Sequence, residues 1–262
     1  MARNAKQFIA QNVRAAVEEF QARPNVTTKF GEPVIEYVNV FHPLFDRLYM
    51  EKLTDHPKKI YTPGHTIIVH YVPLTKEAID DLEANGAAAE KWERAHYDAM
   101  FLSMFINKAI RESLSKLGRI SSITGVPTDW NRTMHMPEWS SKIAAYLAGI
   151  GEIGPAGSFH TADGYGGSVG TVITDGLYAD ECPEMDIEEI ETEIDAIKKA
   201  FCYKNLADVT CSEAMIQACP AGAIDASGID PAKCLAYCES KNVKIPNPDL
   251  CGNCFRFREK TD

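Results

Sequence analysis

The sequence predicts an α/β domain that is followed by a small cysteine-rich module. Two runs rich in β-branched residues, Thr66–Val72 and Ser168–Thr174, are typical of buried strands, and apolar residues recur at helical spacing between them. All eight cysteines lie after residue 181, so a different kind of structure begins there. We therefore predict an α/β domain over residues 1–178 and a second unit, an acidic helix with the cysteine-rich module, over residues 179–262.

The other elements of the first domain follow from helical spacing and from residues that end helices. Pro24, Gly118 and Gly149 each stop a stretch of helical pattern. We expect helices over residues 4–22, 87–117 and 139–148, and a short strand over residues 120–123. The long helix is expected to face the core with large apolar side chains that share one side of it. These are Tyr97, Phe101, Met104 and Phe105.

The net charge of −10 is concentrated in one stretch of the chain. Nine acids and no basic residue lie between Asp180 and Asp195. Four isoleucines at helical spacing predict an amphipathic helix with a solvated acidic face: Ile187, Ile190, Ile194 and Ile197. A docking face for a basic partner is the alternative interpretation. The acidic balance argues against a nucleic-acid partner.

The cysteines indicate a metal site. No apolar run reaches the ~18 residues of a membrane span, and the start of the chain has no export pattern, so we expect a cytoplasmic protein without a membrane partner. Disulfides are disfavoured in that reducing compartment. Cys251-Gly252-Asn253-Cys254 is a CxxC pair that serves either zinc or an iron–sulfur cluster. The segment Cys219-Pro220-Ala221-Gly222-Ala223-Ile224 resembles bacterial ferredoxin motifs, which favours iron–sulfur.

The resemblance to ferredoxins also implies a set of ligands. In the usual C-x2-C-x2-C-x3-C-P motif three cysteines precede the Cys-Pro step, and their positions fall on Val209, Ser212 and Met215 here. One ligand set is therefore absent. The remaining set is complete for one [4Fe-4S] cluster and consists of Cys219, Cys234, Cys251 and Cys254. A second cluster at unusual spacing stays open, from Cys182, Cys202, Cys211 and Cys238.

A glycine-rich segment precedes the acidic stretch. Eight glycines fall within the 22 residues 149–170. They fit either tight turns beside strands or a backbone that approaches a ligand closely. The GxGxxG pattern at residues 149–154 follows a predicted helix rather than a strand, so we exclude a nicotinamide-binding fingerprint.

The same segment resembles a known family. Ala148-Gly149-Ile150-Gly151-Glu152-Ile153-Gly154, a Tyr165-Gly166 loop, a strand that ends in Thr174-Asp175 and the ferredoxin-like module are similar to corrinoid-dependent reductive dehalogenases and epoxyqueuosine reductases. The resemblance implies a nitroreductase-like α/β domain that binds a corrinoid (cobalamin), with iron–sulfur clusters that supply electrons. The cofactor-binding residues that it implies are Gly149, Gly151, Glu152, Gly154, Tyr165, Gly166, Gly167 and Ser168.

The resemblance also suggests catalytic candidates. Counting back fourteen residues from Gly149 places His135 where the queuosine reductases carry a catalytic acid, and a histidine can donate a proton near neutral pH. A purely structural histidine is the alternative. Glu138 and Tyr146 are the other polar candidates. Pro155 departs from the family, because the dehalogenases usually carry arginine there.

The predicted function is a cytoplasmic, corrinoid- and iron–sulfur-dependent reductase that is similar to reductive dehalogenases. It would act on a small-molecule substrate and receive electrons from a reduced ferredoxin- or flavodoxin-type donor. Three alternatives stay open: a non-catalytic corrinoid or electron carrier, a flavin-binding nitroreductase-like reductase, and a zinc-stabilised binding protein.

Overall fold

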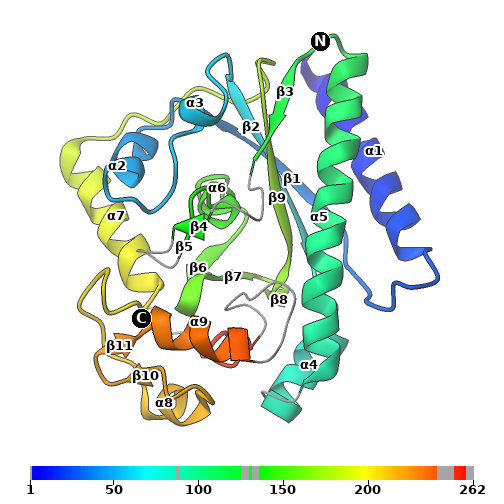
Figure 1. The fold of residues 1–262 in the computed structure, drawn as a ribbon. Coiled ribbons are helices and arrows are strands. Elements are labelled where there is room, and N and C mark those ends of the chain that lie inside the picture. The colour runs from blue at the N-terminus through cyan, green and yellow to red at the C-terminus, as the bar shows by residue number, and fades with distance from the viewer. Residues whose placement is uncertain (1, 87–88, 125–129, 132–135, 241–250, 258–262) are drawn as a thin grey trace.

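A four-stranded antiparallel sheet organises the larger part of the molecule (Figure 1). The structure is a computed structural model that describes residues 2–86, 89–124, 130–131, 136–240 and 251–257. The order of the strands is β1-β2-β9-β3. Their bounds are Val34–Asn39 for β1, Thr66–Pro73 for β2, Gly167–Thr174 for β9 and Ser121–Ile123 for β3. The two strands predicted from β-branched runs thus pair directly at the centre of the sheet.

Helices cover both faces of this sheet. On one side α5 (Glu90–Lys116) packs against β9, and α1 (Ala2–Gln21) packs against α5. On the other side lie α6 (Ser141–Leu147) and α2 (Leu44–Met50), as Figure 1 shows. All eight residues of β2 are buried because the strand is covered from both sides. The mixed α/β prediction is confirmed, with an antiparallel sheet.

The long helix faces the core with a different side from the one predicted. Phe101 and Met104 are 57% and 60% exposed, and Phe105 packs sideways on Phe20 of α1. The buried side of α5 carries Trp92, Ala95, Ala99, Leu102, Ile106 and Ile110. The large aromatic residues indicated one face of the helix. The face that packs on β9 is instead the one that carries the small alanines, which let α5 lie close to the strand.

The glycine-rich segment forms a small sheet that the sequence did not predict. It consists of β6 (Glu152–Gly154), β7 (Ser158–Thr161) and β8 (Gly164–Tyr165), all antiparallel. A 3-10 turn over Pro155–Gly157 joins the first two strands. The segment is therefore a meander rather than two loops around one strand.

The C-terminal part lies at one end of the sheet (Figure 1). The acidic helix α7 (Ile187–Ala200) begins with a capping box between Asp186 and Glu189, which satisfies the first backbone N–H groups. Ile194 and Ile197 are buried as predicted, whereas Ile187 is 79% exposed because it stands at the first position of the helix.

Short elements complete the fold. After α7 come α8 (Glu213–Ala218), β10 (Ile224–Asp225), β11 (Gly228–Ile229) and α9 (Pro231–Ser240). Earlier in the chain are α3 (Pro57–Ile60), α4 (Lys76–Asn85), β4 (Trp130–Asn131) and β5 (Met136–Pro137). Within the described ranges, no helix has the length and apolar character that crossing a membrane requires.

A buried histidine in β2 makes the fold sensitive to acid. His70 is fully buried, its Nε2 lies 2.9 Å from Asn107 Oδ1, and burial lowers its pKa to about 4. Between pH 6.5 and 4 the unfolded chain binds a proton at this residue that the folded chain does not. The stability of the folded protein therefore decreases as the pH is lowered through this window. His70→Gln removes the titration and is expected to remove about 3 kcal/mol of acid destabilisation.

Urea unfolding of both proteins at pH 7 and pH 4.5 checks this prediction. The carboxylates are common to both proteins, so the difference between the two pH dependences isolates residue 70. Equal losses of stability in wild type and variant would assign the acid sensitivity to other groups.

Candidate metal centre

The C-terminal part gathers five of the eight cysteines. Cys219 caps the end of α8, and Cys234 and Cys238 lie four residues apart on α9, which places them on one side of that helix. Cys251 and Cys254 belong to the segment 251–257. All eight cysteines are free thiols.

Electrostatic effects connect the pKa values of several of these thiols. A hydrogen bond with Cys238, burial, and the charges of Cys254, Cys238 and Cys251 raise the pKa of the Cys234 thiol. Burial raises the pKa of Cys251, and the charges of Cys238 and Cys219 raise it further. The pKa of Cys234 is thus affected by Cys238, Cys251 and Cys254, and that of Cys251 by Cys238 and Cys219. The ligand set that the ferredoxin resemblance selected stays a prediction.

Two of the sulfurs accept N–H hydrogen bonds. The Ala223 backbone N–H donates to Cys219 Sγ at 3.3 Å, where Gly222, with a φ of +56°, turns the chain back toward the sulfur. Asn253 Nδ2 donates to Cys251 Sγ at 3.2 Å, and this contact opposes the rise in the pKa of Cys251. Such donors stabilise the thiolate form that a metal requires.

The thiols do not converge on a single point. Among the described residues, no three histidine, cysteine, aspartate or glutamate side chains form an arrangement that could hold one metal ion. The five sulfurs are therefore close enough to affect one another's charge but not arranged around one ion.

The remaining cysteines have other surroundings. Cys202 and Cys211 belong to the hydrophobic core, where they are buried with Phe201, Tyr203 and Met215. Cys182 precedes α7, and burial alone raises its pKa. The interactions that shift the Cys234 and Cys251 thiols involve none of these three.

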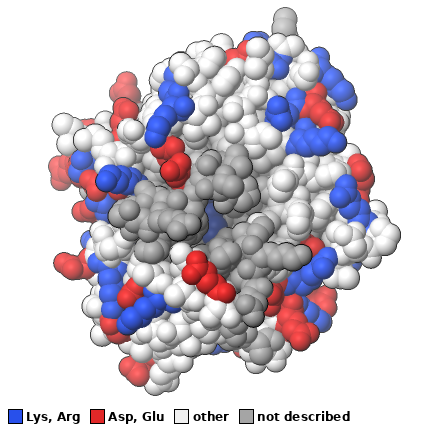
Figure 2. Space-filling view, viewed as in Figure 1, with Lys and Arg blue, Asp and Glu red and all other residues white. Residues whose placement is uncertain are grey.

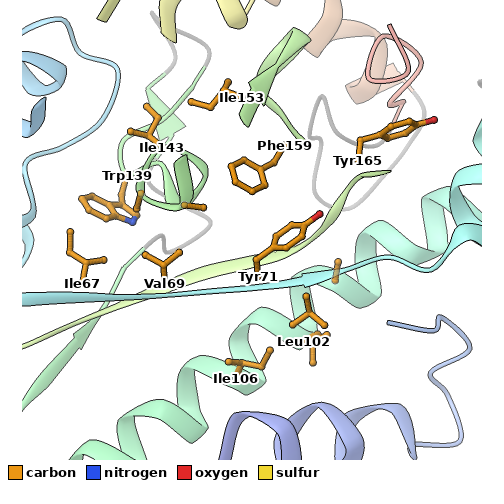
Figure 3. Packing of buried hydrophobic residues seen from close by; sticks show 14 of the residues in the cluster. Ile67, Val69, Tyr71, Leu102, Ile106, Trp139, Ile143, Ile153, Phe159 and Tyr165 are labelled. Carbon is orange, nitrogen blue, oxygen red and sulfur yellow. The ribbon is translucent and has the colours of Figure 1, made fainter. Parts of the chain in front are cut away.

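A small aromatic cavity adjoins the cysteine-bearing segment 251–257. Tyr71, Trp92, Phe159 and Phe255 contribute rings to its wall, and its volume is about 30 Å³. Figure 3 shows Tyr71 of β2 and Phe159 of β7 facing one another, with ring centroids 5.3 Å apart. A space of this size holds about one water molecule.

Trp92 connects the cavity to the cysteines. The Phe255 ring, one residue after Cys254, meets the Trp92 ring edge-on with centroids 6.0 Å apart. A Cβ on Gly252, between Cys251 and Cys254, would lie 2.6 Å from the Trp92 indole nitrogen. The cysteine segment is therefore packed directly onto the first turn of α5.

The cavity also has a basic residue in its wall. Lys142 lines it and donates from Nζ to the Gly157 carbonyl at 2.7 Å. Figure 2 shows Lys and Arg side chains interspersed with Asp and Glu side chains around the edge of this face. Tyr71 and His96 are the other titratable residues that line this cavity. Lys142 and His96 were not predicted from the sequence, because the wall combines segments that are far apart in the chain.

Most of the predicted cofactor-binding glycines are packed against protein. A Cβ on Gly151 would lie 2.2 Å from the His160 carbonyl oxygen, and one on Gly154 would lie 2.5 Å from the ring of the same histidine. Gly166 and Gly167 face Trp92 and Tyr71 in the same way, at 2.9 and 2.7 Å. These four positions are glycine because strands and rings approach them closely.

Gly149 has a different role. With a φ of +69° it ends α6, where its N–H donates to the Tyr146 carbonyl and the Ile150 N–H donates to the Ala145 carbonyl. This pair of bonds is a Schellman motif, which needs a left-handed residue. The GxGxxG pattern therefore begins with a helix stop.

The other residues that the resemblance assigned to the cofactor are placed as follows. Glu152 is exposed on β6. Tyr165 is buried and donates to Glu83 Oε1 at 3.4 Å, and Ser168 is buried and donates to the Ala99 carbonyl at 2.8 Å. Both hydroxyls thus bond to neighbouring helices.

The predicted catalytic residues are not brought together at the cavity. The Tyr146 hydroxyl donates to Glu193 Oε2 at 2.5 Å, which joins α6 to α7, and burial followed by this bond raises the pKa of Tyr146. Glu138 is exposed, and its carbonyl accepts from the Asp55 N–H at 2.5 Å. Neither is among the lining residues of the described cavity. His135 lies outside the described residues.

Comparison with known proteins gives one distant likeness to a solved structure. No protein-family profile and no curated protein matches the sequence. The chain is similar to a crystal structure of selenomethionine-labelled epoxyqueuosine reductase, with 15% sequence identity and a TM-score of 0.44. The match covers 91% of this chain and 60% of the reductase chain, so this chain spans about three fifths of its length. A likeness at this level does not establish a shared family.

Proposed function

We propose that this chain is an iron–sulfur oxidoreductase that transfers single electrons. Cys219, Cys234, Cys251 and Cys254 would ligate one [4Fe-4S] cluster. The observation that supports this proposal is the pair of N–H donors on Cys219 and Cys251, beside the ferredoxin-like Cys219-Pro220 step. Thiolates are the usual ligands of such clusters, and hydrogen bonds to the sulfurs help to set their reduction potentials.

The ferredoxin-like motif around Cys219 favours a cluster over zinc. A zinc ion requires four thiolates at about 2.3 Å from one point. A cluster of four irons is ligated at four separate corners, so its sulfurs stand farther apart. The Cys-Pro step followed by a small residue, Gly and Ala-Ile in Cys219-Pro220-Ala221-Gly222-Ala223-Ile224 resembles ferredoxins, which carry clusters.

Residues of the cysteine segment would cover the cluster on one side, and they also line the cavity. When bound, the cluster supplies one-electron transfer. Phe255 and Gly252 of the cysteine segment pack on Trp92, which would cover the cluster on that side. Lys142 places a positive charge in the cavity wall, beyond the Phe255 ring. Such a charge would stabilise the negative charge that an acceptor gains on reduction. The small-molecule acceptor and the ferredoxin- or flavodoxin-type donor are carried over from the family resemblance.

A corrinoid does not fit the described cavity. The space of about 30 Å³ is far smaller than that cofactor, and protein atoms already occupy the positions beside Gly151, Gly154, Gly166 and Gly167. We therefore derive no step through a corrinoid.

Metal and sulfide analysis of anaerobically purified protein tests the proposal. We expect about four iron and about four sulfide per chain, because the complete ligand set serves one cluster. The same sample is analysed for zinc, cobalt and flavin. One zinc per chain without sulfide would overturn the proposal in favour of a zinc-stabilised protein. About eight iron would show that the other cysteines build a second cluster.

A further inference from the structure

A second cavity lies at the starts of α4 and α5. Its volume is about 300 Å³, which is at the lower end of the range for small-molecule sites. The loop after α1, the first turn of α4 and the first two turns of α5 form its wall. It shares no lining residue with the aromatic cavity, which Trp92 and His96 line from another side of α5. The proposed cluster therefore gives this second cavity no role.

A buried carboxylate holds an arginine in the wall of this cavity. Asp98 is 3% exposed and accepts from Arg94 Nε at 3.1 Å and from the Thr28 hydroxyl at 2.6 Å. Its other oxygen lies 3.1 Å from Arg94 Nη2, which also donates to the Asn25 carbonyl. The Nη1 group has no acceptor among the described residues, so it keeps two N–H donors for a group in the cavity. Because the guanidinium is already fixed, a ligand would not have to order it.

The other charges of the wall form one pair and two single groups. Lys91 Nζ lies 2.6 Å from Glu77 Oε1. Lys29 and Glu90 form no ion pair with any other residue that the structure describes. The backbone of Lys29 is held by Thr75, whose N–H and hydroxyl both donate to the Lys29 carbonyl at 3.2 Å. The wall therefore presents one unpaired positive and one unpaired negative side chain from different segments.

We propose that this cavity binds a small zwitterion of the amino-acid type, with a free carboxylate and a free ammonium group. The carboxylate would accept from Arg94 Nη1 and from Lys29, because guanidinium and ammonium groups are strong donors to carboxylates. The ammonium group would donate to Glu90. With Asp98 included, basic and acidic side chains around the cavity are equal in number, so a ligand that is neutral overall leaves no net charge there. The inference does not depend on the proposed cluster.

Thermal unfolding of the full chain with each of the standard amino acids tests this inference. Each is added at about 10 mM, which reveals a Kd in the millimolar range or below as a rise in Tm. At least one amino acid is expected to raise the Tm. Its amide lacks the carboxylate and its N-acetyl derivative lacks the ammonium group. By calorimetric titration, both are expected to bind at least about tenfold more weakly than the parent amino acid.

Two variants show whether the amino acid binds in this cavity. Lys29→Gln and Glu90→Gln each remove one charge from an exposed side chain, so the Tm without ligand should not change. Each is expected to weaken binding by about tenfold, because one charge-assisted hydrogen bond is lost. Lys108→Gln and Glu112→Gln are the matched controls, since these residues form an exposed ion pair at 3.7 Å farther along α5. Both controls should bind as the wild type does.

Several outcomes would contradict the inference. One is a wild-type protein that no amino acid stabilises. Equal binding of the parent amino acid and both derivatives would show that its two charged groups are not recognised. Unchanged affinity in Lys29→Gln and Glu90→Gln would place the binding outside this cavity. Stabilisation by inorganic phosphate but by no amino acid would make the cavity a site for simple anions. The iron content tests the cluster separately, so the two proposals can fail independently.

Discussion

Replacing Cys251 by alanine is expected to abolish the cluster, with iron falling from about four per chain to well below one. Cys251 and Cys254 are the two thiols that the segment 251–257 contributes, and both are needed for a four-thiolate site. The cysteine that lies within four residues of Cys251 is Cys254, which is itself a proposed ligand. Metal binding and local folding are coupled, so this segment should also lose its packing on Trp92.

Iron and sulfide analysis, the visible absorption of the cluster and Trp92-sensitive fluorescence check this result together. Cys182→Ala is the matched control, because Cys182 is also a half-buried free thiol but its pKa is raised by burial alone, with no contribution from another cysteine. The control should keep its iron. Equal iron in Cys251→Ala and wild type would show that the ligand set is wrong.

The sequence predicted the parts of the fold that depend on local chemistry. The β-branched runs gave β2 and β9, and Gly149 gave the end of α6, because a left-handed residue is needed there. The four proposed ligands were also selected from the sequence, since the spacing of a cysteine motif reflects the ligation that it serves. The electrostatic effects between several of these thiols come from the structure.

The parts that depend on distant partners were not predictable. Which side of α5 faces the sheet depends on the fit of Ala95 and Ala99 against β9, and larger residues on the other side gave a stronger but misleading pattern. The cavity is similar in this respect, because Trp92, Lys142 and Phe255 come from three distant segments. The ferredoxin motif has no position for Cys238. Its place one helical turn after Cys234 is clear only when α9 is known.

The meander β6–β8 shows how glycines were misinterpreted. Dense glycine suggested a backbone lying against a large cofactor. In the structure the same residues let β6 and β7 approach each other, and let β9 approach the ring of Tyr71. Both explanations use the missing side chain, and only the identity of the neighbouring atoms distinguishes them.

Gly151→Ala is expected to destabilise the folded protein by about 3 kcal/mol, the upper part of the range for overpacked sites. The new Cβ would lie 2.2 Å from the His160 carbonyl oxygen, and this backbone atom is held in the β6–β7 ladder. Neither group can move without breaking that ladder. Urea unfolding of the wild type and the variant, both without added cofactor, measures the loss.

Gly149→Ala is the control for this prediction, since a Cβ there meets no atom within 4 Å and the cost is only that of the left-handed backbone, roughly 1 kcal/mol. The comparison decides between the two roles of the glycines. If Gly151 packs against protein, the variant is unstable without any ligand, and added cobalamin gives no base-off spectrum with either protein. If Gly151 contacts a corrinoid, the variant keeps the stability of the wild type, and it loses a cobalamin spectrum that the wild type shows. We expect the first result. The added Cβ would lie 2.2 Å from a backbone oxygen of the same chain, so the clash needs no bound ligand.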